Sequence, residues 1–163
     1  MATPLHLRSR FKSLLGLDGK THLKPGDAAP EIDAVDQDGK HWTLATLRGK
    51  PAVVYFYPKD DTPGCTREAC DFRDQGEALG ATVLGVSGDD AQSHHAFIGK
   101  FNLRFPLLVD TEGAVATRFG AWNEGRARRA TFVIDRDGRI AAVFDPVKVD
   151  GHVAEVKAAV AAL

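Results

Sequence analysis

The two cysteines of the chain, Cys65 and Cys70, lie five residues apart in one short segment. This segment directly follows the strongest apolar run of the sequence, residues 52–57, which has the length and the β-branched and aromatic content of a buried strand. Pro58 ends the run. Two thiols placed so closely behind a buried strand favour a redox site, so the first chemistry to expect is that of a thiolate.

A helix is predicted to begin near Pro63. Thr62 is a suitable N-cap residue, and proline is favoured at the first helical position because its missing N–H would have no partner there. Cys65 then falls in the first turn, where free N–H groups and the positive end of the helix dipole favour an anion. Such surroundings lower the pKa of a cysteine thiol from about 8.5. We therefore expect Cys65 to act as a nucleophilic thiolate.

The two cysteines point in different directions along this helix. Five helical residues rotate about 140° and rise about 7.5 Å, so their Cα atoms are roughly 8 to 9 Å apart on an intact helix. The two Cα atoms of a disulfide can lie no more than about 7 Å apart. A bond between Cys65 and Cys70 therefore requires the first turns of the helix to unwind. The face of Cys65 also carries the small and apolar residues Ala69, Phe72, Gly76 and Leu79.

The segment Pro58-x3-Thr62-x2-Cys65 resembles the active-site motif of the peroxiredoxins. The second cysteine, five residues on, is similar to that of the Q-type group, also called bacterioferritin comigratory proteins. Residues 23–30 resemble the usual opening of this family, and residues 129–135 resemble the later strand that brings an arginine to the site. The resemblance extends to Leu163. It implies an α/β, thioredoxin-like fold: a central mixed β-sheet flanked by helices, with an N-terminal β-hairpin.

The resemblance implies a role for each cysteine. Cys65 would be the peroxidatic cysteine, which attacks the O–O bond of a hydroperoxide and becomes a sulfenic acid while water or an alcohol leaves. Cys70 would be the resolving cysteine, which attacks the sulfenic sulfur and forms an intramolecular disulfide. A thioredoxin-type dithiol would then reduce that disulfide by exchange.

The resemblance also assigns roles to residues around the sulfur. Thr62 would hold the thiolate and the peroxide oxygen through its hydroxyl, and Pro58 would shield the sulfur from water. Arg129 would stabilise the thiolate and the charge that develops on the leaving oxygen. Backbone N–H groups at Gly64 and at the cysteine itself would add donors. Arg128 is an alternative to Arg129, since both belong to a basic run that would ordinarily be a solvated loop.

Two other functional classes remain open at this point. A thioredoxin-like disulfide oxidoreductase fits the fold but usually needs a Cys-x-x-Cys pair, and a non-catalytic redox sensor would use the same disulfide to remodel a surface. The cysteines could also be half of a metal site. No further cysteine exists, and His41, His94 and His95 are scattered, so we expect no metal and no cofactor. His94 and His95 are interpreted as residues of a surface helix, and Trp122 as a packing residue.

The composition indicates one globular domain, since 163 residues with 44% hydrophobic and 26% charged side chains can bury a sizeable core. A net charge of -1 gives no reason to expect nucleic acid or an anionic membrane as a partner. Two cysteines are too few for a disulfide-stabilised secreted protein, so we expect a reducing, cytoplasmic environment. One chain supplies both sulfurs, so a monomer is expected.

Residues 1–22 are predicted to be a basic, amphipathic extension that precedes a single domain over residues 23–163. Charges interrupt its apolar residues, so it lacks the apolar core of a secretory signal, and no stretch of the chain is long enough to span a membrane. Its apolar residues at helical spacing are Leu7, Phe11, Leu14 and Leu15, and its basic residues are Arg8, Arg10, Lys12 and Lys20.

The remaining pattern alternates strands and helices, as expected of a thioredoxin-like domain. We predict a hairpin of residues 31–35 and 40–44, strands at 82–87 and 106–110, helices at 90–101 and 113–119, paired strands at 131–135 and 139–144, and a closing helix at 149–163. One apolar stripe of the closing helix should comprise Val153, Val156, Val160 and Leu163.

Overall fold

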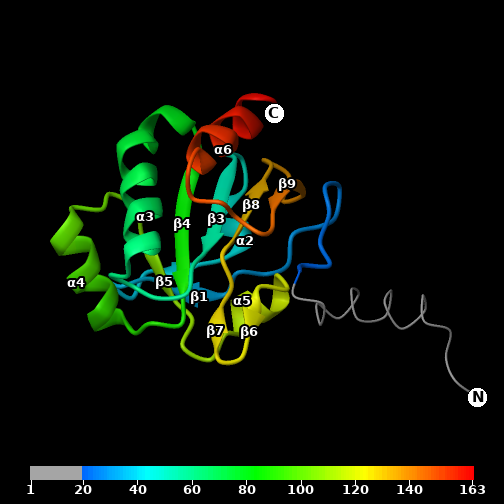
Figure 1. Ribbon diagram of the computed structural model, residues 1–163. Helices are drawn as coiled ribbons and strands as arrows, with labels where there is room; N and C mark the ends of the chain where they lie inside the picture. The colour runs from blue at the N-terminus through cyan, green and yellow to red at the C-terminus, as the bar shows by residue number, and fades with distance from the viewer. Residues whose placement is uncertain (1–19) are drawn as a thin grey trace, which may run out of the picture.

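A five-stranded mixed β-sheet runs through the centre of the molecule and carries helices on both faces (Figure 1). The computed structural model describes residues 20–163, so nearly all of the predicted N-terminal extension, with its amphipathic helix, lies outside the described residues. The sheet consists of β3 (Ala52–Phe56), β4 (Thr82–Ser87), β5 (Leu107–Val109), β8 (Ala130–Ile134) and β9 (Ile140–Phe144), in the order β5-β4-β3-β8-β9. Strands β3, β4 and β5 are parallel, and β8 and β9 run antiparallel to their neighbours.

Shorter elements complete the described chain. Two small sheets pair β1 (Ala34–Val35) with β2 (His41–Trp42) and β6 (Trp122–Asn123) with β7 (Arg126–Ala127). The helices are α2 (Leu44–Leu47), α3 (Pro63–Gln75), α4 (Ala91–Phe101), α5 (Ala114–Arg118) and α6 (His152–Ala161), with a 3-10 turn η1 (Glu77–Leu79) after α3. The central mixed sheet, the flanking helices and the N-terminal hairpin agree with the predicted architecture.

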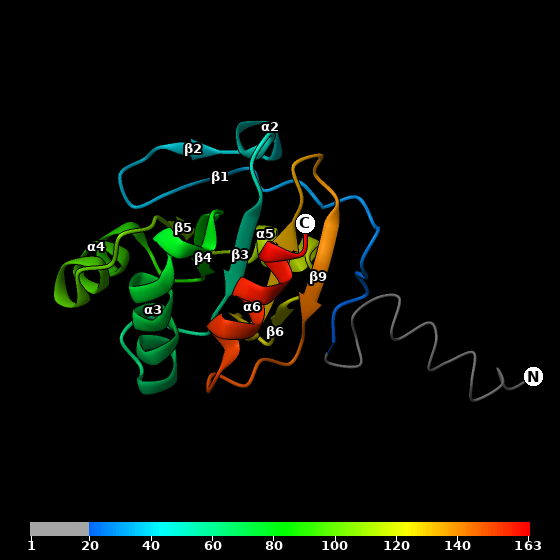
Figure 2. The ribbon, with the colours of Figure 1, turned by 90° about the horizontal axis from the view of Figure 1, so that it is seen from above.

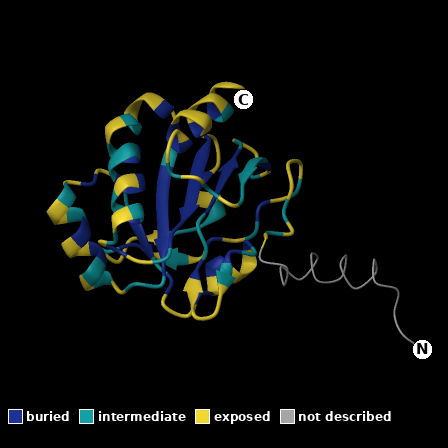
Figure 3. Cartoon of the chain, viewed as in Figure 1, coloured by how far each residue is buried: buried dark blue, intermediate teal, exposed yellow. Residues whose placement is uncertain are grey.

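Strand β3 occupies the middle of the sheet, and all five of its residues are buried (Figure 3). Both of its faces are covered, which explains its unbroken apolar sequence. Val53 and Tyr55 face the layer of α3, α4 and α6, whereas Val54 and Phe56 face the layer of α5 and α2. Figure 2 shows α3 and α6 on the same side of the sheet. The segment after β3 therefore leaves the most buried strand and enters the helix that packs against it.

Most element boundaries follow the sequence pattern, but four expectations are corrected. The predicted strand at 40–44 is shorter, because Thr43 caps helix α2 and Leu44 is its first residue. The closing helix α6 begins at His152, three residues later than predicted. Its apolar stripe ends at Val160, because Leu163 lies beyond the helix and is 55% exposed. His94, interpreted as a surface residue, is fully buried because its polar ring atoms find partners inside the molecule. Its neighbour His95 is exposed, as predicted.

No helix within residues 20–163 combines the length and the apolar character that a membrane span requires.

Candidate active site

Helix α3 holds Cys65 in its first turn, directly behind the end of β3. Thr62 is the N-cap residue and Pro63 the first helical residue, as the sequence predicts. The first bond of the helix runs from the N–H of Thr66 to the carbonyl oxygen of Thr62, at 2.8 Å. The N–H groups of Gly64 and Cys65 precede this bond, so they have no carbonyl one turn earlier in the helix to bind.

The hydroxyl of Thr62 differs from the expectation for an N-cap. It makes no bond to the helix N–H groups and instead donates to the carbonyl oxygen of Lys59, at 2.9 Å. This bond closes the turn that connects β3 to α3. The side chain of Thr62 therefore stabilises the loop before the helix, and the structure shows it bonded to that loop.

Arg129 reaches the sulfur of Cys65 from the neighbouring strand. The residue precedes β8, whose first residue, Ala130, pairs with Phe56 at the end of β3. This register brings Arg129 alongside the start of α3. Its Nη2 donates to Sγ of Cys65 at 3.2 Å, and its Nη1 donates to Oε1 of Glu68 at 2.9 Å. One guanidinium thus contacts the sulfur and a carboxylate at the same time.

Arg128, the alternative candidate, has a different environment. Its guanidinium forms a two-pronged ion pair with Asp145, at 2.7 and 3.1 Å, and also donates to the carbonyl oxygen of Gly120. Successive side chains of an extended chain point to opposite sides. Arg128 and Arg129 are therefore directed to different partners, and of these two arginines Arg129 is the one that contacts Cys65.

Gly64 lies under the guanidinium of Arg129. A Cβ atom at this position would lie 3.2 Å from Nη2 of Arg129, closer than an ordinary van der Waals contact. Glycine therefore leaves the space through which the arginine approaches the first turn of α3.

Glu68 belongs to the site, although it was not singled out from the sequence. It is fully buried, and burial raises its pKa to about 7, only partly offset by the charge and hydrogen bond of Arg129. Its Oε2 has no hydrogen-bond partner among the described residues. The sequence did contain a signal, because three residues after Cys65 is a position on the same helix face.

His152 and Tyr55 surround this buried carboxylate. Nε2 of His152 lies 3.9 Å from Oε2 of Glu68, and burial, followed by repulsion from Arg129, lowers the pKa of His152 to about 4. Burial, reinforced by Glu68, raises the pKa of Tyr55 well above its ordinary value. Both side chains are therefore neutral at physiological pH, and Arg129 is the cation that faces Cys65 and Glu68.

Cys70 is half-buried, and both cysteines are free thiols. Helix α3 is continuous through both of them. The structure therefore shows the reduced form, in which the predicted disulfide has not formed and would require local unwinding.

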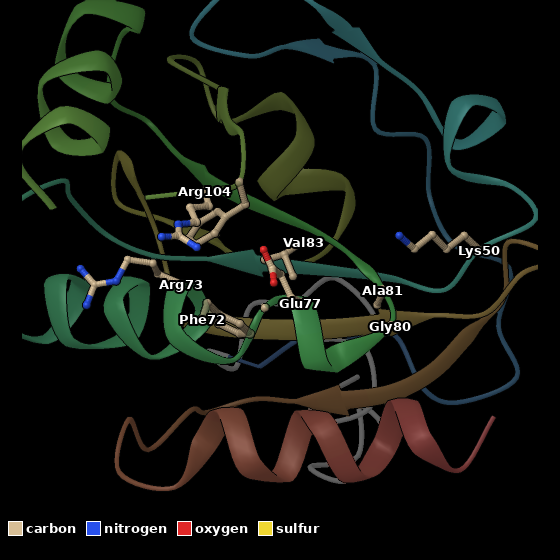
Figure 4. Close-up of a pocket in the computed structure, with 10 residues that line it drawn as sticks. Lys50, Phe72, Arg73, Glu77, Gly80, Ala81, Val83 and Arg104 are labelled. Atoms are coloured by element: carbon tan, nitrogen blue, oxygen red, sulfur yellow. The ribbon is translucent and has the colours of Figure 1, made fainter. Parts of the chain in front are cut away.

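A pocket of about 580 Å³ opens beside the site. Pro58 and Arg129 line it on the side of Cys65, and the β6–β7 hairpin forms its other wall. A second pocket, of about 240 Å³, lies at the far end of α3 (Figure 4). Its cationic side chains include Arg73 and Arg104, and it contains none of the predicted site residues.

One group among residues 20–163 has the side-chain types of a metal site. Carboxylate and imidazole atoms of Asp60, Asp89 and His94 all lie within 4.8 Å of one another. Each of the three side chains is already hydrogen-bonded within the protein. We assign no metal to this group.

Known proteins are similar to this chain in both sequence and architecture. The AhpC/TSA family model matches residues 25–143. The putative peroxiredoxin bcp of Coxiella burnetii is 43% identical over 82% of this chain and 96% of its own length. Peroxiredoxin Bcp of Bacillus subtilis is 45% identical over 82% of this chain and 92% of its own. The solved structure of the Xanthomonas campestris bacterioferritin comigratory protein is 31% identical, with a TM-score of 0.79 over 85% of this chain and 98% of that one.

These matches include the buried strand, the helix of both cysteines and the strand of the arginine, and the structural match establishes the thioredoxin-like fold expected from the sequence. The relatives are named as peroxiredoxins, and peroxiredoxins are thiol peroxidases. The chain belongs to the AhpC/TSA family and, within it, to the Bcp or Q-type peroxiredoxins.

Proposed function

We propose that Cys65 is the peroxidatic cysteine of this thiol peroxidase. Its thiolate attacks one oxygen of a hydroperoxide, the O–O bond breaks, and the second oxygen leaves as water or an alcohol once it has gained a proton. The cysteine becomes a sulfenic acid. The observation that carries this assignment is the 3.2 Å contact between Nη2 of Arg129 and the buried Sγ of Cys65.

Arg129 supplies the electrostatic part of the reaction. Its fixed positive charge stabilises the thiolate before the attack and the leaving oxygen during it. Glu68 holds the other edge of the guanidinium, so the arginine is oriented before the peroxide arrives. The free N–H groups of Gly64 and Cys65 are further donors at the helix terminus.

Pro58 and Thr62 complete the proposed site. Pro58 lines the pocket beside Arg129, where it limits the access of water to the sulfur. Thr62 contributes a hydroxyl to the peroxide oxygen, which requires this hydroxyl to leave the carbonyl oxygen of Lys59 when substrate binds.

Cys70 is the resolving cysteine of the proposed cycle. Its sulfur attacks the sulfenic sulfur of Cys65, a disulfide forms, and the hydroxyl group leaves as water after it takes up a proton. Helix α3 unwinds locally for this step, because its intact geometry keeps the two residues too far apart. A thioredoxin-type dithiol then reduces the disulfide by exchange and is itself oxidised.

The substrate class is hydrogen peroxide together with organic hydroperoxides. The pocket of about 580 Å³ has room for a small organic group next to Arg129. The similar bacterioferritin comigratory protein of Xanthomonas campestris is described as having alkyl peroxide reduction activity. We assign the activity to residues 23–163, with residues 1–22 as an extension. We expect a monomer because one chain provides both thiols, and a reducing compartment because two cysteines are too few for a disulfide-stabilised secreted protein.

The test is the reaction of each cysteine variant with peroxide. In stopped flow, Cys65→Ser should not consume hydrogen peroxide, whereas Cys70→Ser should react once and stop as a sulfenic acid. Mass mapping of the oxidised parent should find a bond between Cys65 and Cys70. A Cys65→Ser protein that consumes peroxide as fast as the parent excludes the proposal, and rapid reduction of insulin without peroxide would favour a disulfide oxidoreductase.

A further inference from the structure

A buried polar network lies behind the loop that joins β3 to α3. This loop, residues 58–62, carries two of the proposed site residues and delivers Cys65 to the helix terminus. Its centre is Asp60, which is 6% exposed although neighbouring residues of the loop are solvent-accessible. A carboxylate in such a position is stable only when protein donors replace the lost water.

Three polar side chains contact the carboxylate of Asp60. Oδ1 accepts from the hydroxyl of Tyr57 at 2.6 Å, and Oδ2 accepts from the hydroxyl of Ser93 at 2.8 Å. Oδ2 also lies 2.7 Å from Nδ1 of His94. Burial, and then the negative charges around it, raise the pKa of Tyr57 well above its ordinary value, so its phenol keeps the hydrogen that it donates.

The hydrogen bonds of His94 define its orientation. Nε2 lies 2.9 Å from the carbonyl oxygen of Leu108 in β5. A carbonyl oxygen can only accept, so Nε2 donates to it, and Nδ1 is the ring nitrogen that faces Asp60. Through these two contacts the fully buried ring connects the active-site loop to β5, the edge strand of the mixed sheet.

The backbone of the loop is held at the same residue. The N–H of Asp60 donates to Oδ2 of Asp89 at 2.9 Å, and the hydroxyl of Ser87 donates to the same oxygen at 2.6 Å. Asp60 is thus bound directly to α4 and to Asp89, and through Asp89 and His94 it is connected to β4 and β5. Every one of these partners lies outside α3.

We propose that His94 and Asp60 are positioning residues of the peroxidatic site. They hold loop 58–62 against the sheet, so that Pro58 and Thr62 keep their places beside Cys65 and Arg129. Because the network takes no partner from α3, it persists while that helix unwinds for the disulfide. This inference rests on the proposed function, but it concerns how the loop is held and not which residue reacts.

Two substitutions of His94 separate positioning from simple stability. His94→Asn retains a donor near the place of Nδ1 and so keeps a bond to Asp60, whereas His94→Gln retains a donor near Nε2 and keeps the bond to Leu108. Each loses one of the two hydrogen bonds and leaves a cavity, so their free energies of unfolding should fall by similar amounts. Only His94→Gln releases the loop.

The readout is the rate constant for peroxide oxidation of Cys65, measured by stopped flow. A displacement of the loop by a fraction of an ångström should slow this step about 10-fold or more in His94→Gln, and less than about three-fold in His94→Asn. Asp60→Ala should also slow it about 10-fold, since it removes both oxygens that contact Tyr57, Ser93 and His94. The subsequent rate of disulfide formation should not fall in any of them.

An exposed contact of the same loop provides the control. Nζ of Lys100 pairs with Asp61 at 2.8 Å at the surface, so Lys100→Ala should leave the rate unchanged. Equal rates for His94→Asn and His94→Gln, or a parent-like rate for Asp60→Ala, would overturn the inference. Should both His94 variants fail to fold, the comparison of Asp60→Ala with Lys100→Ala decides. An unreactive parent would instead count against the proposed function. The inference itself concerns only the ratio of the variant's rate constant to that of the parent.

Discussion

The substitution Glu68→Gln tests the electrostatic description of the active site. Glu68 is fully buried, one of its oxygens binds Arg129, and the other has no partner among the described residues. Glutamine has nearly the same shape and can still accept a hydrogen bond from Arg129. The substitution therefore removes the ionisation of this side chain and leaves its packing in place.

The size of the effect follows from the pKa of Glu68, which burial raises from 4.5 to about 7 despite the opposing charge of Arg129. A carboxyl whose pKa is higher in the folded protein binds its proton more tightly there. Its contribution to stability is therefore present below pH 4.5 and is lost as the pH rises to about 7. The full loss corresponds to about 3 kcal/mol, of which about 2.5 kcal/mol falls between pH 5 and pH 8.

The assay is urea unfolding of parent and variant with both thiols kept reduced, at pH values from 5 to 8. In the difference between the two free energies of unfolding, the contributions of the other titrating groups cancel. One of these is His152, whose pKa is lowered to about 4 by burial and by Arg129, and which therefore costs stability as the pH falls below its ordinary value of 6.5. The parent should lose about 2.5 kcal/mol relative to Glu68→Gln between pH 5 and pH 8.

An exposed glutamate provides the control for this measurement. Glu112 lies in a surface loop, so the free energies of unfolding of Glu112→Gln and the parent should differ by the same amount at every pH from 5 to 8. A flat difference for Glu68→Gln as well would refute the reasoning. It would mean that Arg129 compensates fully for the burial of Glu68, and that the carboxylate is as stable in the protein as in water.

Four further outcomes are expected. Gly64→Ala places a Cβ 3.2 Å from the guanidinium of Arg129 and should slow peroxide reduction about 10-fold. Its control, Gly99→Ala, meets no atom within 4 Å and should react like the parent. Arg129→Lys cannot span the sulfur and the carboxylate together, so kcat/KM for peroxide should fall about 100-fold; a drop below three-fold would contradict its role. On oxidation, residues 65–74 should lose amide protection, and unchanged exchange would exclude unwinding. Cys70→Ser should form more sulfinic acid than the parent after a peroxide pulse, measured by mass spectrometry.

The elements that place the cysteine could be predicted because their signals are local. Strand β3 is buried on both faces and has a continuous apolar sequence, and the start of α3 is marked by Thr62 and Pro63. The choice between Arg128 and Arg129 could not be made from local signals. It depends on the register of β8 against β3, which no local pattern contains, and Arg129 was favoured only by the family resemblance and by its position two residues before the strand core.

The buried polar residues could not be placed from the sequence. His94 looked like a surface residue because its partner Asp60 lies 34 positions earlier in the chain. Glu68 interrupts an otherwise apolar face, and its partner Arg129 lies 61 positions later. Burial of a charged side chain becomes favourable only when the fold brings its partner to it. A periodicity read along one helix does not include that partner.

The proposed cycle places opposite demands on one segment, because Cys65 must be held firmly for the attack and released for the disulfide. In our proposal these two tasks fall to different parts of the site. Loop 58–62 is held by the network of Asp60, which takes no partner from α3, whereas α3 carries Cys65 and Glu68, to which Arg129 donates. An outer contact of α3, the ion pair of Arg67 with Asp150, is exposed and adds little to the cost of unwinding. We therefore expect loop 58–62 to stay in place while the helix opens, and Arg129 to regain its bonds to Cys65 and Glu68 when the helix refolds.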